Sequence, residues 1–302
     1  MSYIRTQRFG SGAVILRNRD GSALTLDQIT ASAPSVVASE PHESRSDRYA
    51  FIPTRDVLAG LMSEGFAPFE VRQGGSKDAD KRAKTKHMIR MRHASAGAVE
   101  IARGDRIAPE IIILNSHDGS SSYQLTAGAF RFVCTNGLIA GDAFEHMKVA
   151  HKGDVMGEVI DAAFRVVQDF PRLVDGAQEM AGVQLSQGER LAFARAAAML
   201  RWEPEKIDGE ERQTAPIPAE QLLRIRRDAD APGDLWRTMN RVQESLIGGG
   251  QTYSQPWTPG PGRQRRPTQR RVREVKGIDQ NRQINRALWT LAEEMTRLKA
   301  AA

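Results

Sequence analysis

The stretch of sequence that decides the fold is Pro109-Glu-Ile-Ile-Ile-Leu114, followed directly by Asn115-Ser-His-Asp-Gly-Ser120. The first part is the most apolar and β-branched run in the chain, a composition typical of a central, buried strand. The second part favours a tight turn, because Asn and Asp hydrogen-bond to nearby backbone and Gly accepts a positive φ. The stretch therefore predicts the centre of a β-sheet that ends in a polar loop.

Short strands separated by turn residues are expected before this centre. Residues 13–16 and 66–71 have the pattern of strands. A helix between them is predicted to be capped by Thr54 and closed by Gly65. The first half of the chain therefore alternates strands with one short helix.

The segment His87-Met-Ile-Arg-Met-Arg-His93 predicts a strand with one apolar and one basic face. Its period of two puts Ile89 and Met91 on one face and Arg90 and Arg92 on the other. After the polar loop, residues 121–134 surround Gly128 with large apolar side chains, which indicates two strand pieces or one bent strand. A helix in the middle of that segment is the alternative.

From residue 155 onward the apolar period becomes helical. Apolar residues recur at helical spacing up to Phe170, and Pro171 limits that segment. Ser186, with Glu189 three residues later, predicts a second helix that begins with a capping box. Further helices are predicted over residues 219–226 and 234–246.

The predicted fold class is α+β: an N-terminal, mainly antiparallel sheet with a short helix, followed by a helical layer, a flexible basic linker and a C-terminal helix. The linker has three consecutive glycines and four prolines and too little apolar surface to order itself. The terminal helix has an apolar stripe from Ile284 to Leu298 that needs a partner, either the body or a second copy. The expected parts are 1–150 for the sheet core, 151–247 for the helical part packed on it, 248–276 for the linker and 277–302 for the terminal helix.

The charge of the chain is unevenly distributed. The 302 residues carry 43 Lys and Arg against 37 Asp and Glu, a net charge of +6. Residues 259–302 contain 11 basic and four acidic side chains, and residues 72–106 contain 10 basic and four acidic ones. Clustered basic side chains displace counterions from a nucleic-acid backbone. The alternative is that both clusters are solvated, charged surface.

Composition also excludes several classes of protein. The single cysteine, Cys134, allows no internal disulfide framework and no zinc site of several thiolates, and it fits a reducing cytoplasm. No apolar run approaches the roughly 20 residues of a bilayer crossing, and the N-terminus lacks the apolar region of a signal peptide. No nucleotide or metal-binding motif is present. We therefore expect a cytoplasmic protein without membrane association, cofactor or metal.

The polar loop after the central strand is the sharpest local feature. Asn115, His117, Asp118 and Gly119 are of the types that position nucleophiles, bind metals or hold phosphates, and they are equally the types that make tight turns. We interpret them, together with Asn136 of the later Asn-Gly turn, as a structural turn, with a ligand role as the alternative. No catalytic residue is assigned.

The basic clusters provide candidate phosphate contacts. Arginines that alternate along a strand, with aromatic side chains nearby, are typical of a single-strand track. Arg131 is expected either to pair with Asp118 in a buried bridge or to accept a phosphate. The predicted nucleic-acid-binding residues are Lys84, Lys86, Arg90, Arg92, Arg131, Arg265, Arg266, Arg270 and Arg271.

The run from Pro109 to Leu125, with Gly128, Phe130-Arg131 and Cys134-Thr-Asn-Gly137, resembles the core signature of the DUF932 family, phage- and plasmid-encoded proteins of unassigned function. The similarity extends loosely over most of residues 1–247. The family supplies no catalytic residues to carry over. The resemblance implies a setting among the DNA-processing genes of mobile elements.

Three functions are compatible with the sequence. The favoured one is a non-enzymatic nucleic-acid-binding protein of a phage, prophage or plasmid, with DNA, expected to be single-stranded, as its partner. Its narrower form is an annealing or recombination accessory that acts as a homo-oligomer. The second is an interaction protein that antagonises a host defence system. The third is a metal-dependent nuclease or hydrolase that uses Asn115, His117 and Asp118.

Overall fold

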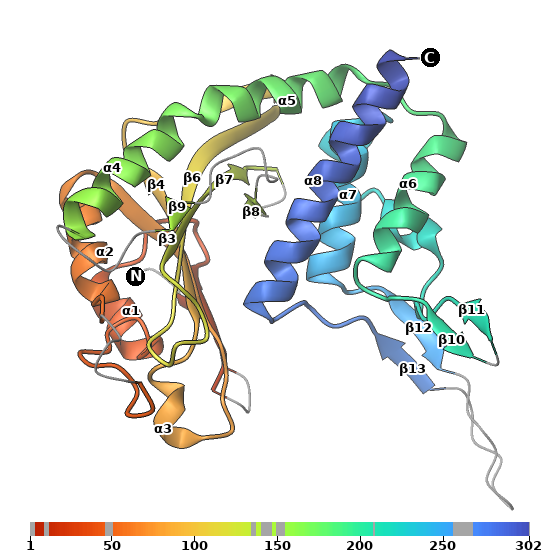
Figure 1. Cartoon of the computed structure of the whole chain (residues 1–302). Helices are drawn as coiled ribbons and strands as arrows, with labels where there is room; N and C mark the ends of the chain where they lie inside the picture. Colours follow the sequence, from red (N-terminus) through yellow and green to blue (C-terminus); the bar gives the residue numbers. More distant parts are fainter. Residues whose placement is uncertain are drawn as a thin grey trace, which may run out of the picture. The chain divides into compact units, whose positions relative to one another are not determined.

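The apolar stretch 109–114 lies within strand β6 (Asp105–Asn115) in the computed structural model of the chain (Figure 1). Every residue of this strand from Ile107 onward is buried, as its composition predicts. The structure describes residues 4–8, 12–45, 51–133, 137–139, 147–148, 155–207, 209–255 and 268–301.

Strand β6 belongs to an antiparallel sheet, which confirms the prediction for the first half of the chain. Residues 121–134 contribute one strand to it, so the helix considered for that segment does not form. The order is β1 (Ile4–Arg8), β2 (Val14–Asn18), β3 (Phe66–Gln73), β4 (His87–His93), β6, β7 (Gln124–Arg131) and β8 (Gly137–Ile139), with β5 (Val99–Ala102) paired to β6 and β9 (Met147–Lys148) paired to β7.

Helices cover one face of this sheet. The ring of His93 lies 5.6 Å from the ring of Phe164 in α4 (Val155–Gln168), and His87 contacts Thr54 in α2 (Thr54–Ser63). Because side chains alternate along a strand, the odd-numbered residues of β4 face these helices, and Arg90 and Arg92 face the opposite side. The predicted division of β4 into an apolar and a basic face is therefore confirmed. The other helices of this region are α1 (Leu26–Ser32) and α3 (Ala79–Arg82).

Thr54 does not cap its helix, contrary to the sequence prediction. The N-cap of α2 is Pro53, which offers no side-chain hydrogen bond, and Thr54 is the first helical residue. Its hydroxyl is instead engaged by buried side chains, accepting from Asn115 and donating to His87. Gly65 closes the segment as predicted, with a φ of 88° that L side chains rarely adopt.

The chain divides into two compact units. The first comprises residues 1–100, 105–174 and 276–278, and the second comprises residues 101–104, 175–275 and 279–302. The boundary between the units falls within helix α5 (Phe170–Gly182). Helix α4 packs on β6 and β7 and so belongs to the sheet unit.

The second unit is mainly helical. Ser186 begins helix α6 (Gln187–Met199) with the predicted capping box, in which Ser186 and Glu189 accept from each other's backbone N–H. The helix predicted at 219–226 is only a 3₁₀ segment, η1 (Ala219–Leu223). The remaining elements are the hairpin β10 (Glu205–Ile207) and β11 (Glu210–Arg212), the 3₁₀ segment η2 (Asp228–Asp230) and helix α7 (Leu235–Gly248).

The predicted disordered linker over residues 248–276 is partly wrong. Strands β12 (Thr252–Gln255) and β13 (Thr268–Arg271) pair antiparallel, and residues 256–267 between them lie outside the described part of the chain. The φ values of 64° at Gly249 and 92° at Gly250 let the backbone turn, and Gly250 N–H donates to Val272 O at 2.9 Å. These backbone contacts, with Val272 and Val275 buried, hold residues 249–255 and 268–275, for which composition alone predicts disorder.

The terminal helix α8 (Ile278–Ala300) finds its partner within the chain. Ile284, Leu288 and Trp289 are buried, and Asn285 accepts a 2.6 Å hydrogen bond from Gln243 of α7. Leu298, the last residue of the predicted stripe, is 66% exposed. The first part of the stripe, with Ile284 and Leu288, therefore belongs to the core of the second unit.

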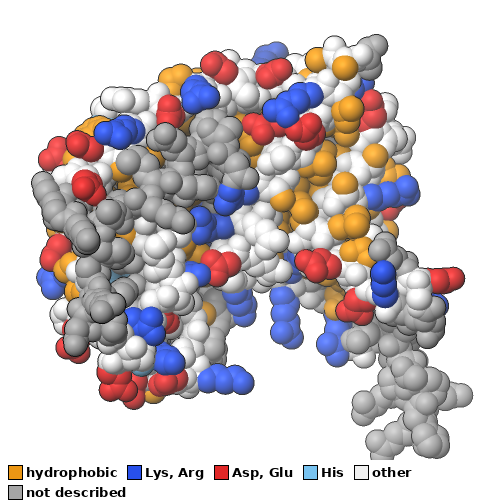
Figure 2. Space-filling model, viewed as in Figure 1, with side chains coloured by type: hydrophobic (Ala, Val, Ile, Leu, Met, Phe, Trp, Pro, Cys, Tyr) orange, Lys and Arg blue, Asp and Glu red, His pale blue; other side chains and the backbone are white. Residues whose placement is uncertain are grey.

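The visible surface carries both signs of charge. Figure 2 shows acidic and basic side chains interspersed over both units, and hydrophobic side chains gathered over helices of the second unit. No helix among the described residues is long and apolar enough to cross a membrane.

Candidate functional site

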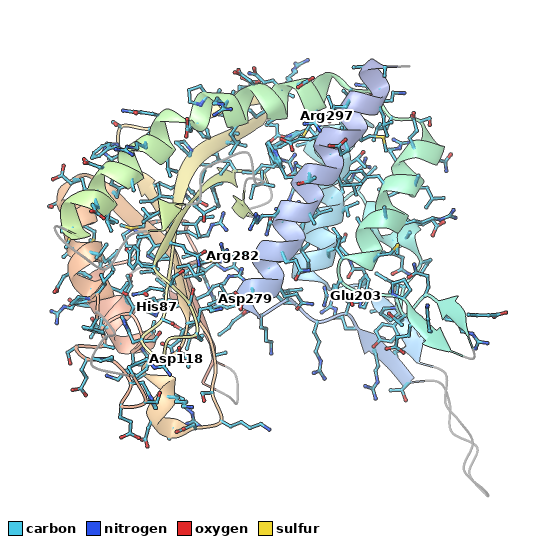
Figure 3. The ribbon with its side chains drawn as sticks, viewed as in Figure 1. His87, Asp118, Glu203, Asp279, Arg282 and Arg297 are labelled. Atoms are coloured by element: carbon cyan, nitrogen blue, oxygen red, sulfur yellow. The ribbon has the colours of Figure 1, made fainter. Side chains whose placement is uncertain are left out.

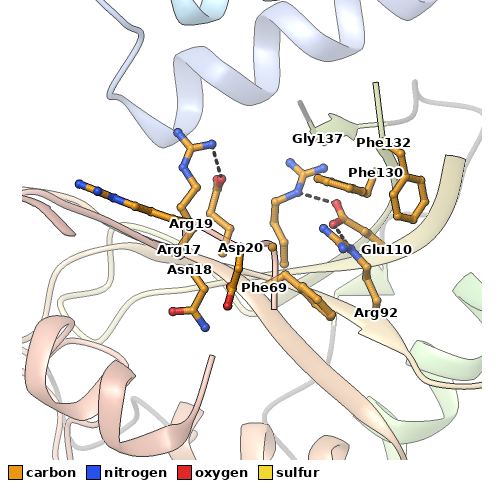
Figure 4. A pocket seen from close by; sticks show the side chains of 13 residues that line it. Arg17, Asn18, Arg19, Asp20, Phe69, Arg92, Glu110, Phe130, Phe132 and Gly137 are labelled. Carbon is orange, nitrogen blue, oxygen red and sulfur yellow. Dashed lines mark hydrogen bonds and ion pairs between the residues drawn. The ribbon is translucent and has the colours of Figure 1, made fainter. Parts of the chain in front are cut away.

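A cavity of about 630 Å³ lies on the sheet face opposite α2 and α4 (Figure 4). This volume is that of a typical small-ligand site, for which roughly 300–1,000 Å³ is usual. Four arginines, three carboxylates and three phenylalanines are among its walls. Its lining residues are Arg17, Asn18, Arg19, Asp20, Gly21, Phe69, Glu70, Arg90, Arg92, Glu110, Phe130, Phe132 and Gly137.

Arg92 is held between two aromatic rings. Its guanidinium carbon lies 3.9 Å from the ring centre of Phe69 and 3.6 Å from that of Phe130, and Figure 4 shows the guanidinium between them. Its Nε donates to Glu110 Oε1 at 2.9 Å. Neither terminal nitrogen has a hydrogen-bond partner among the described residues. A guanidinium fixed through Nε and both faces presents these two nitrogens as a preformed fork for an oxyanion.

Glu110 orients a second arginine as well. Arg90 donates from Nε to Glu110 Oε2 at 2.7 Å and from Nη2 to Leu138 O at 2.7 Å. Glu110 is 2% exposed, so its charge is compensated by the two arginines. Gly137 leaves room for Arg90 in this position, because a Cβ atom there would overlap the guanidinium.

A second carboxylate holds the arginines at the other side of the cavity. Arg72 donates to Glu70 at 2.6 Å, and Arg17 lies 3.7 Å from the same carboxylate. Burial by itself would raise the pKa of Glu70, but Arg72, Arg17 and Arg90 outweigh it and lower the pKa to about 2. Glu70 is therefore ionised near neutral pH, and it keeps part of the arginine charge compensated.

The first residues of the polar loop, 115–117, form a buried hub on the helix-covered side of the sheet, where His87 and Asp118 are labelled in Figure 3. Asn115 Nδ2 donates to Thr54 Oγ1 at 2.9 Å, and His87 Nε2 lies 2.9 Å from the same oxygen. His117 Nε2 is 3.4 Å from it. Asn115 and His117 are buried, so the loop joins the sheet to α2.

The hydrogen bonds fix the proton positions in this hub. Since the carbonyl of Thr85 can only accept, the nearby Nδ1 of His87 must carry the proton, and its Nε2 accepts from the Thr54 hydroxyl. Burial, with the neighbouring His117, lowers the pKa of His87 to about 3. Burial, with the neighbouring Lys84, lowers the pKa of His117 to about 4. Both imidazoles are therefore neutral at pH 7.

Asp118 and Gly119 complete a turn. Asp118 Oδ1 accepts from the backbone N–H of Ser120 at 2.9 Å, and Gly119 has a φ of 78°. A side chain at 119 would also overlap the guanidinium of Arg45. These contacts agree with the interpretation of a structural turn. Within the described ranges, no group of three or more His, Cys, Asp or Glu side chains could hold a metal ion.

Arg131 does not take the position that the sequence predicted. It donates from Nε and Nη2 to Asp105, and not to Asp118, and both side chains are fully buried. Arg131 directly follows the cavity residue Phe130 in β7. Because successive side chains of a strand point to opposite faces, Arg131 points away from the cavity. A phosphate contact by Arg131 is therefore incompatible with this structure.

The other predicted contacts are dispersed. Arg90 and Arg92 meet in the cavity, whereas Lys84 donates to Glu40 O at 2.6 Å and Lys86 is not a cavity residue. Arg270 and Arg271 are exposed on β13 in the second unit. Asn136, Arg265 and Arg266 lie outside the described residues.

Sequence reasoning missed most of the cavity wall. Glu110 is the residue from which the site could have been predicted, because a carboxylate within an apolar central strand requires a buried cationic partner. Phe69 gave no such signal. The register of β3 shifts between Pro68 and Glu70, and a shift of this kind re-aims side chains locally.

The geometry defines a two-unit α+β protein with an arginine-lined cavity on one sheet face. The chain belongs to the family described as a domain of unknown function, DUF932, which matches residues 41–289. Two Escherichia coli (strain K12) relatives, UPF0380 protein YafZ and UPF0380 protein YfjQ, are each 40% identical to it over 288 residues, 95% of this chain and 96% of each relative. No solved structure matches the chain.

Proposed function

We propose that this chain is a non-enzymatic nucleic-acid-binding protein whose first unit contacts a backbone phosphate at the Arg92 cavity. The observation that carries the proposal is the position of Arg92 between Phe69 and Phe130, with Nε on Glu110 and two terminal nitrogens left for a ligand. Planar, bidentate recognition by arginine is typical of phosphate sites.

The charge of the cavity also supports an anionic ligand. Arg17, Arg19, Arg90 and Arg92 face three carboxylates, so the lining carries one more positive than negative charge. A phosphodiester, with one negative charge, matches that excess. The exposed arginines of β13 are a second candidate contact for the same polymer.

The wider setting is part of the proposal. We infer from the sequence resemblance that the protein acts in the cytoplasm on the DNA of a phage, prophage or plasmid. An annealing or recombination accessory that works as a homo-oligomer is the narrower form. It predicts faster pairing of complementary strands in the presence of the protein.

The proposal is tested by the fluorescence anisotropy of a labelled DNA strand titrated with the full chain. Between about 50 mM and about 200 mM salt, the affinity should fall steeply, because phosphate contacts release counterions. Arg92→Lys keeps the charge but loses the planar fork, and it should weaken binding about tenfold.

The matched control is Arg55→Lys, the same substitution at an exposed arginine of α2, on the other side of the sheet. It should bind as the unaltered chain does. Absence of binding at low salt, or equal affinities for Arg92→Lys and Arg55→Lys, would show that the proposal is wrong.

A further inference from the structure

A large aromatic ring is exposed at the rim of the cavity. Phe132 is 48% exposed, although its neighbours Phe69 and Phe130 are partly covered. Its ring lies 5.1 Å from that of Phe130 at an angle of 84°, an edge-to-face contact that holds it in place. The guanidinium of Arg106 lies 6.0 Å from its centre. A fixed and accessible ring of this kind is a stacking platform for a flat ligand.

Phe130 contacts both the exposed ring of Phe132 and the guanidinium of Arg92. Phe130 contacts the Arg92 guanidinium on its face, at 3.6 Å, and is in ring contact with Phe132 at 5.1 Å. Phe130 therefore lies between Arg92 and Phe132, and all three line the same cavity. A ligand that joins an anionic group to a flat ring could reach both.

From this juxtaposition we infer that the cavity takes one unpaired nucleotide of a nucleic-acid strand, with its phosphate on Arg92 and its base on Phe132. The inference rests on the proposed function and names the ligand of the same site. In a duplex each base is already stacked and paired, whereas a single strand offers base faces to aromatic side chains. The site therefore selects single strands over duplexes.

The experiment compares three labelled DNA ligands by anisotropy: one single strand, the same strand in a duplex, and an abasic strand of equal length that keeps only sugar and phosphate. The full chain is tested beside Phe132→Ala and Phe132→Tyr. Met199→Ala is the matched control, since Met199 is 43% exposed on α6.

The single strand should bind more tightly than the duplex. Phe132→Ala should weaken its binding about tenfold, because stacking on an aromatic side chain makes a contribution of that order. Phe132→Tyr keeps the ring and should restore affinity. The abasic strand should be insensitive to Phe132→Ala, because it has no base to stack.

The outcomes separate this inference from the proposed function. If single strand and duplex bind equally, with an Arg92→Lys effect but no Phe132→Ala effect, the nucleotide site is refuted and phosphate binding stands. If no DNA ligand binds at low salt, both are refuted. If Phe132→Ala weakens the abasic strand as much as the normal one, the ring acts on the fold of the cavity and not on a base, which also overturns the inference.

Discussion

Arg131 and Asp105 form a fully buried ion pair, in which Arg131 Nη2 lies 2.6 Å from Asp105 Oδ2. Removing one partner leaves the other charge in the protein interior. We therefore expect Asp105→Ala to lower the free energy of unfolding by about 3–5 kcal/mol, measured by urea denaturation. Replacing both residues with apolar side chains, as in Asp105→Leu with Arg131→Met, should recover most of this loss.

A surface pair provides the control for that prediction. Lys299 and Glu189 lie 2.9 Å apart with about a third of each side chain exposed, and Lys299→Ala should cost less than about 1 kcal/mol. Equal losses in Asp105→Ala and Lys299→Ala would contradict the role assigned to the buried pair.

A side chain at position 137 is expected to displace Arg90. Gly137→Ala places a methyl group where the guanidinium lies, so Arg90 must move and its bonds to Glu110 and Leu138 must weaken. The expected cost is about 1–3 kcal/mol of stability. Binding of DNA should weaken in the anisotropy titration as well, because Glu110 also orients Arg92.

Gly97→Ala is the matched substitution for this test. No atom lies within 4 Å of a Cβ built at Gly97, so stability and binding should both be retained. A Gly137→Ala variant as stable as Gly97→Ala and with full affinity would show that the contact with Arg90 is dispensable.

Two of the four cavity arginines, Arg90 and Arg92, could be predicted from the sequence, and the arrangement around them could not. Alternation along β4 alone puts Arg90 and Arg92 on one face, because a strand has a period of two. The contacts that hold these arginines come from Glu110 of β6 and Phe130 of β7. The positions of Glu110 and Phe130 follow from strand register. Register over separated strands is a property of the whole sheet.

The polar loop 115–120 likewise combines a local feature that the sequence predicts with a distant contact that it does not. The turn at Asp118 and Gly119 follows from local chemistry and was predicted as such. The partner of Asn115 and His117 is Thr54, which is distant in the sequence and was assigned to a helix cap. A polar residue at a helix start has two possible uses, and only the tertiary contacts decide between them.

The neutral histidines of the hub predict acid sensitivity. His87 and His117 have pKa values of about 3 and about 4, against 6.5 when exposed, so the unfolded chain binds more protons as the pH falls below 6.5. Stability should therefore fall with decreasing pH, by up to about 1.4 kcal/mol per histidine for each pH unit. Urea denaturation at about pH 7 and about pH 5 measures this loss.

The histidines and Glu70 affect the stability of the protein over different pH ranges. The pKa of Glu70 is lowered from 4.5 to about 2, so its contribution is present above pH 4.5 and is lost only below that value. His117→Gln should remove about half of the dependence between pH 7 and pH 5. A stability that stays constant over this interval in the unaltered chain would exclude buried, neutral imidazoles.

The basic C-terminal segment is part of the fold, and this determines how its charge must be tested. Deleting residues 259–302 would remove α8 and expose the core that Ile284, Leu288 and Trp289 help to form. Such a truncation should unfold the second unit, seen as a loss of helical circular dichroism beyond that of α8 itself. Arg270→Gln is the suitable variant, because Arg270 is exposed on β13.

If the hairpin contacts the nucleic-acid backbone, Arg270→Gln should weaken DNA binding to a similar degree for every sequence. It should also reduce the slope of log affinity against log salt by about one. Thermal unfolding should be unchanged, since surface substitutions of this kind alter stability by less than about 0.5 kcal/mol. An unchanged salt slope would assign the phosphate contacts to the first unit alone, where Arg92 and its neighbours line the cavity.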